Sequence, residues 1–106
     1  DAASANSRVG ETRDLIEQLV RDSWSNLATA KATHQFLANQ ASISAEFLEL
    51  ARKERKLGNR SLLDVLNGET ALINANSDAT SARTDVVIAT ITLLNAMGRL
   101  ELKAIQ

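Results

Sequence analysis

Apolar and small residues recur along residues 11–57 in alternating steps of four and three. This spacing is typical of a heptad repeat, in which one face of a helix packs against another helix in a left-handed coiled coil. No Gly or Pro interrupts the run from Glu11 to Leu57, so the pattern predicts one long helix over residues 11–57. We call these positions the inner stripe of the first helix: Ile16, Val20, Ser23, Leu27, Ala30, His34, Leu37, Ala41, Ser44, Leu48 and Ala51.

The same spacing returns after a short break and predicts a second long helix over residues 62–104. Gly68 lies on this heptad pattern, and we expect a glycine there to let the partner helix approach closely. The inner stripe of the second helix is Val65, Gly68, Leu72, Ala75, Ala79, Ala82, Val86, Ala89, Leu93, Ala96 and Leu100.

Alanine and serine dominate both inner stripes, and they bury little surface. A buried methylene contributes about 0.8 kcal/mol and a fully buried leucine about 1.5–3 kcal/mol, so two helices joined in this way are weakly held. Each helix also carries a second apolar stripe, for which we expect lateral helical neighbours. These outer stripes are Phe36, Ile43, Phe47, Leu50 and Leu57 on the first helix, and Leu66, Ile73, Thr80, Val87, Ile91 and Leu94 on the second.

The break between the helices has the residues of a tight turn over residues 58–61. Gly58 suits the left-handed conformation that ends a helix, and Asn59 tolerates loop conformations. Ser61 is a good N-cap, and Asp64 three residues later makes a variant of the capping box. The fold class predicted is therefore all-α, a long antiparallel coiled-coil hairpin, with a flexible start over the small and polar residues 1–10.

Composition narrows the functional classes. The chain has 106 residues, a net charge of −1 and no Cys, which gives no reason to expect nucleic acid, a disulfide framework or a thiolate metal site. No apolar run reaches the roughly 18–20 residues of a spanning helix. The first residue is Asp1, so we expect a processed product or part of a larger protein.

No catalytic constellation is present in the sequence. The single His34 has no Cys, second His or carboxylate cluster beside it, so we interpret it as a partly buried inner-stripe residue rather than a metal ligand. Without a glycine-rich phosphate loop or paired acids, we expect neither an enzyme nor a cofactor.

Positive charge gathers before the turn. Residues 52–60, RKERKLGNR, hold five basic residues and one acidic residue. Basic groups near a helix C-terminus interact favourably with its dipole, and this alone accounts for part of the pattern. The other interpretation is a charged tip that meets a partner.

The turn and the helix after it resemble a known family. LGNRSLLDVLNGETAL, followed by NANSDATSARTDVVIATITLLNAMGRL, is similar to the last periplasmic helical hairpin of the TolC-type outer-membrane channel proteins of efflux and type I secretion. The likeness covers residues 11–100. It implies a homotrimeric parent with a helical tunnel in the periplasm of a Gram-negative bacterium. It further implies that the hairpin tips close the tunnel entrance and dock a periplasmic adaptor protein, which is joined to an inner-membrane pump.

The resemblance also assigns residues at the tip. Gly58 matches the family's tip glycine, Arg60 its basic tip residue and Asp64 its acidic residue after the tip. Two positions depart from the pattern: Asn67 stands where some members have a second acid, and Arg55 where some have a tyrosine of the closing network. The predicted gate and adaptor-docking tip comprises Arg55, Gly58, Asn59, Arg60, Ser61, Asp64 and Asn67.

Two other interpretations remain open. One is a signalling or scaffolding coiled-coil hairpin, although the tip carries no receptor-type signature. The other is self-association of two hairpins into a four-helix bundle through the outer stripes, which predicts that the isolated chain dimerises.

Overall fold

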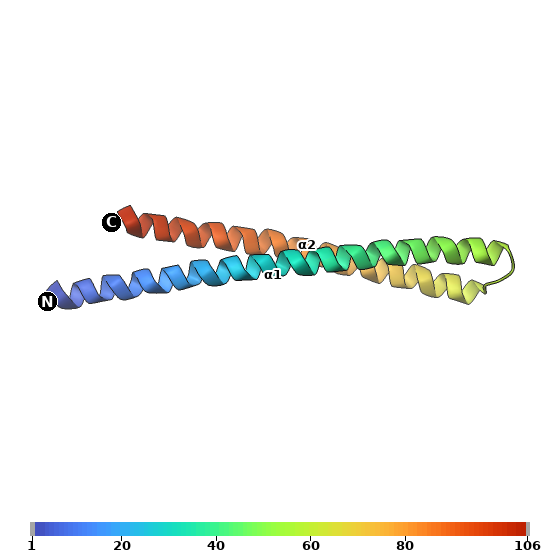
Figure 1. The fold of residues 1–106 in the computed structure, drawn as a ribbon, viewed down its shortest axis with the longest axis horizontal. Coiled ribbons are helices and arrows are strands. Elements are labelled where there is room, and N and C mark those ends of the chain that lie inside the picture. Colours follow the sequence, from blue (N-terminus) through green and yellow to red (C-terminus); the bar gives the residue numbers. More distant parts are fainter. Residues whose placement is uncertain (1, 106) are drawn as a thin grey trace.

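The computed structural model describes residues 2–105 and shows a single helical hairpin (Figure 1). Helix α1 runs from Ala2 to Lys56 and helix α2 from Leu62 to Ile105, joined by residues 57–61, which we call the tip. The hairpin measures 84 × 18 × 13 Å, and both of its ends lie opposite the tip (Figure 1). The predicted all-α hairpin is therefore confirmed.

The helix boundaries differ from prediction mainly at the start of the chain. Helix α1 begins at Ala2, well before the predicted start at Glu11. Alanine has the highest helix propensity, and Ala2, Ala3 and Ala5 lie in this segment. These residues therefore continue helix α1 toward the N-terminus. Flexibility of residues 2–10 stays a prediction, and Asp1 lies outside the described residues.

The inner stripes form the contact between the two helices. Every inner-stripe residue of α1 and α2 is buried or half-buried, as the heptad spacing predicts. The buried apolar side chains all belong to these stripes: Ala41, Leu48, Ala51, Val65, Ala82, Leu93 and Ala96.

The best-packed part of this contact lies near the tip. Leu48, Ala51 and Val65 form a buried cluster, and Leu72 packs against it. A Cβ atom placed on Gly68 would lie 3.2 Å from Leu48 Cδ1, closer than ordinary van der Waals contact. Glycine at this position therefore lets the Leu48 side chain lie directly on the α2 backbone.

The outer stripes face solvent on both helices. Phe36 is 68% exposed and Ile73 is 67% exposed, and the other large apolar members are exposed as well. The hairpin alone thus leaves an apolar face on each helix without cover.

Neither described helix combines the length and the apolar character needed to cross a bilayer.

Candidate functional site at the hairpin tip

Helix α1 ends in a paired hydrogen-bond pattern that reverses the chain. The Gly58 N–H donates to the Arg55 carbonyl at 2.9 Å, and the Asn59 N–H donates to the Glu54 carbonyl at 2.8 Å. These two bonds, with Gly58 at a φ of 81°, make a Schellman motif. The predicted role of Gly58 as the residue that ends the first helix is confirmed.

Helix α2 begins with a side-chain cap. The Asp64 N–H donates to Ser61 Oγ at 3.2 Å, which confirms Ser61 as the N-cap. Asp64 lies in the first turn, where the helix dipole favours a negative charge. Ser61 and Asp64 are both exposed, so the cap leaves the Asp64 carboxylate accessible to solvent or to a partner.

Arg60 folds back onto its own hairpin. Its Nε donates to Glu54 Oε2 in an ion pair, and its guanidinium lies 5.1 Å from the centroid of the Phe47 ring. The hydrogen bond and the charge of Glu54, with a smaller contribution from Asp64, raise the pKa of Arg60 above its usual value. Arg60 therefore holds the tip against α1.

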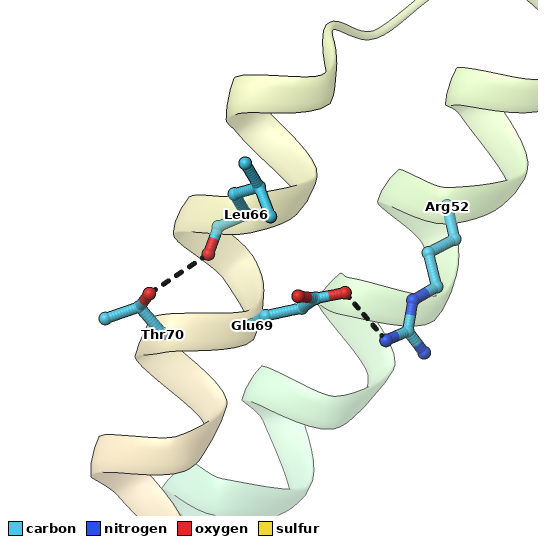
Figure 2. Close-up of polar contacts among 4 residues, drawn as sticks. All are labelled: Arg52, Leu66, Glu69 and Thr70. Atoms are coloured by element: carbon cyan, nitrogen blue, oxygen red, sulfur yellow. Dashed lines mark hydrogen bonds and ion pairs between the residues drawn. The ribbon is translucent and has the colours of Figure 1, made fainter.

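Two further ion pairs use basic residues near the tip. Arg52 Nη2 reaches from α1 to Glu69 Oε1 on α2 at 3.0 Å (Figure 2). Lys53 pairs with Glu49 along α1 at 3.6 Å. Arg55 and Lys56 make no such ion pair within residues 2–105, so of the five basic residues in residues 52–60 they are the two whose charge no glutamate of the hairpin neutralises.

A groove of about 470 Å³ lies between the end of α1 and the start of α2. Val65, which is 5% exposed, forms part of its floor, while Leu62 and Leu66 are about half exposed. Leu66 lies in the first turns of α2, where its carbonyl accepts a hydrogen bond from Thr70 Oγ1 at 3.1 Å (Figure 2). We call this site the basic groove; its lining residues are Arg52, Arg55, Lys56, Leu62, Val65, Leu66 and Glu69.

The predicted tip residues divide into four groups. Gly58 and Ser61 shape the turn, Arg60 pairs within the hairpin, and Arg55 lines the basic groove. The remaining three, Asn59, Asp64 and Asn67, have exposed side chains at the tip or in the first turns of α2.

The partners of the basic residues were not predicted from the sequence. Glu54 and Phe47 hold Arg60, and Glu69 holds Arg52. Glu54 was visible as the single acid among five bases in residues 52–60, which was a usable signal. Glu69 gave no comparable signal, because its contact depends on how the two helices are aligned.

The described residues show no grouping that suits a metal ion. Over the part of the chain that the structure describes, no three His, Asp or Glu side chains come together as ligands. His34 is half-buried on the inner stripe of α1.

The arrangement at the tip is suited to contact with another protein surface, through exposed charges and a partly apolar groove.

Sequence comparison bears out the resemblance of this chain to the TolC-type outer-membrane efflux proteins. Over 98 residues, which make up 91% of this chain, it is 38% identical to outer membrane efflux protein BepC of Brucella suis biovar 1 (strain 1330). The chain spans 21% of the length of that relative. No family model matches the chain, and no solved structure matches it.

Proposed function

We propose that this chain is a periplasmic hairpin of a TolC-like export channel in the outer membrane of a Gram-negative bacterium. Its helices form part of the tunnel wall, and its tip lies at the periplasmic entrance. The observation that carries the proposal is the 38% identity to an outer membrane efflux protein over 91% of the chain.

The exposed outer stripes support a place in a tunnel wall. A hairpin that leaves Phe36, Ile43 and Ile73 exposed needs further helices beside it, because large apolar surfaces are rarely left open in a stable soluble assembly. In a homotrimeric parent, neighbouring hairpins cover these stripes. The small residues of the inner stripes let the two helices of the hairpin lie close together side by side within the wall.

The tip is proposed to gate the entrance and to dock a periplasmic adaptor, which links the channel to an inner-membrane pump. Asn59 lies in the tip and is exposed, and Asp64 presents a carboxylate one turn further on. Threefold repetition of Asp64 around the entrance raises the local cation concentration.

Cross-linking tests the docking. In the full-length protein, Asn59→Cys is expected to form a cross-link to the adaptor in cells, through a short thiol-to-amine reagent. Asn76→Cys, also exposed but far along α2, is the matched control and should form none. Equal yields from the two positions would exclude docking at the tip.

Ion selectivity tests the gate. In the reconstituted full-length channel, Asp64→Ala is expected to raise the permeability to anions relative to cations, because it removes one negative charge per protomer at the entrance. Ser61→Ala is the control, since it weakens the same helix start without changing the charge. The gate role is refuted if Asp64→Ala and Ser61→Ala leave the same selectivity.

A further inference from the structure

One side of α2 carries carboxylates and no basic residue over most of its length. Residues that come directly before an inner-stripe residue lie on this side, and over residues 64–95 none of them is basic. Leu66, Ile73 and most other outer-stripe residues of α2 come directly after one, so they lie on the opposite side of the contact with α1. We call the exposed polar residues of the first side the acidic flank: Asp64, Asn67, Asn74, Asp78, Ser81 and Asp85.

The acidic flank stays in contact with water when the hairpin joins a wall. In the proposed function neighbouring helices cover the outer stripe of α2, and α1 covers its inner stripe. The carboxylates of Asp64, Asp78 and Asp85 are left on the wet surface, and they make no ion pair within residues 2–105. Because these three residues are spaced by whole heptads, a tunnel that Asp64 faces at its entrance is faced further in by the other two.

Asp85 differs from the other two carboxylates because both helices build a polar groove around it. Two hollows of about 290 and 190 Å³ lie between α1 and α2, and Asp85 and Asn26 line both of them. No basic residue of the described chain lines either hollow. A carboxylate beside amide and hydroxyl oxygens suits a cation that has lost part of its water. The hydroxyl residues of the lining are Ser23, Thr29, Thr33 and Thr92.

We propose that the acidic flank lines the inside of the tunnel and that Asp85 is a second charge-selecting residue, beyond Asp64 at the entrance. The inference rests on the proposed function and names the side of the hairpin that meets the cargo. Asp85 lies three heptads after Asp64, which places it about 30 Å farther along the helix. This separation exceeds the Debye length of about 8 Å at physiological salt, so the two residues attract cations independently.

Ion selectivity of the reconstituted full-length channel tests the role of Asp85. Asp85→Asn removes the charge but keeps the size of the side chain, and it should lower the permeability of K⁺ relative to Cl⁻ at least about twofold in dilute KCl. Glu101→Gln is the matched control and should leave the ratio unchanged, because Glu101 comes directly after inner-stripe Leu100 and lies on the opposite side. Asp64→Ala combined with Asp85→Asn should lower the ratio further than either change alone.

Cysteine modification tests which side of α2 faces the tunnel. Ser81 belongs to the acidic flank, whereas Asn76 comes directly after an inner-stripe residue, and both side chains are exposed. Each is replaced by cysteine in a full-length protein otherwise free of cysteine, and a cationic methanethiosulfonate reagent is added to the open channel. The reagent should reduce the conductance of the Ser81→Cys channel, because it places bulk and positive charge in the path of the ions. The Asn76→Cys channel should be unaffected.

Each result has a defined meaning. Equal selectivity of the Asp85→Asn and Glu101→Gln channels, or loss of conductance at Asn76→Cys rather than Ser81→Cys, overturns the inference. If that happens while Asp64→Ala still changes selectivity, the gate at the entrance stands and only the assignment of the acidic flank is wrong. If the full-length protein forms no conducting channel, the proposed function and the inference fall together.

Discussion

At the scale of single residues, Gly58 determines how α1 ends. Its φ of 81° lies in the left-handed region, and the described part of the chain has no other residue with a positive φ. For a residue with a Cβ atom this conformation costs roughly 1–2 kcal/mol. The Schellman bonds at Gly58 and Asn59 depend on it.

Gly58→Ala is therefore expected to lower the free energy of unfolding by roughly 1–2 kcal/mol in urea titrations. Gly98→Ala is the matched control, because Gly98 lies within α2 with no neighbouring atom within 4 Å of an added Cβ. There alanine should stabilise the helix by up to about 1 kcal/mol. A shift of the same sign in both variants would contradict the role assigned to Gly58.

The Glu54–Arg60 pair fixes the tip loop on α1. Glu54→Gln removes the charge that holds Arg60, so the loop should open more often and the Asn59 amide should exchange with solvent faster. Native-state hydrogen exchange measures this at single-amide resolution. Glu49→Gln breaks only the Lys53 pair along α1 and should leave the exchange rate of the Asn59 amide unchanged. Equal effects of the two variants would show that the Glu54–Arg60 pair does not hold the tip loop.

At the scale of elements, α1 and α2 pack tightly where Gly68 meets Leu48. An added Cβ would lie 3.2 Å from Leu48 Cδ1 and 3.9 Å from the Phe47 ring. A longer side chain at residue 68 must displace Leu48 from the buried cluster with Ala51 and Val65. Close approach of the two helices near the tip thus depends on this one position.

Gly68→Leu is expected to destabilise the hairpin by about 1–3 kcal/mol, because overpacking outweighs the gain in helix propensity. Thermal unfolding followed by circular dichroism at several urea concentrations gives the change. Gly98→Leu, placed in open space on the same helix, should be neutral or stabilising. If Gly68→Leu proves as stable as the Gly98 variant, the close-packing interpretation is wrong.

Much of the element-level structure was predictable from the sequence. Heptad spacing identified residues such as Ala41 and Ala82 as contact positions, and they are buried, because periodicity directly reports which face of a helix is covered. Gly58 and Ser61 predicted the ends of the helices, since each meets a specific backbone requirement.

The charge pairs were less predictable, for a physical reason. Arg60 reaches Glu54 only because the Schellman turn folds the chain back along one particular path. The sequence predicts the turn but not where the side chains beyond it will lie. Arg52 reaches Glu69 only through the alignment of α1 with α2. The basic groove follows from these contacts, so the sequence pointed to a charged tip but not to its two unpaired cations.

At the scale of the whole molecule, the hairpin is a narrow rod with uncovered apolar stripes. Its 84 Å length and 18 × 13 Å cross-section leave little interior, and its exposed side chains include Phe36, Ile43, Val87 and Ile91. Such surface favours association with other helices. In the isolated chain, a second copy is the available partner.

The isolated chain is therefore expected to dimerise into a four-helix bundle, measured by sedimentation equilibrium over a wide range of concentrations. Phe36→Gln with Ile43→Gln should weaken the dimer at least about tenfold, because two exposed apolar side chains no longer leave water. Asn39→Gln with Ser42→Gln changes exposed polar neighbours and should have no effect. A strictly monomeric wild-type profile at high concentration would exclude the prediction, and with it the scaffolding alternative.

The position of the two chain ends has a mechanical consequence. Both lie at the end of the rod opposite the tip, so the hairpin is attached to the rest of any longer protein at one end only (Figure 1). A rod held in this way acts as a lever, in which a small tilt at the attached end becomes a much larger sweep at the free end. The Glu54–Arg60 pair and the Leu48 cluster hold the free end together, so we expect a tilt of the attached end to move the tip as one body.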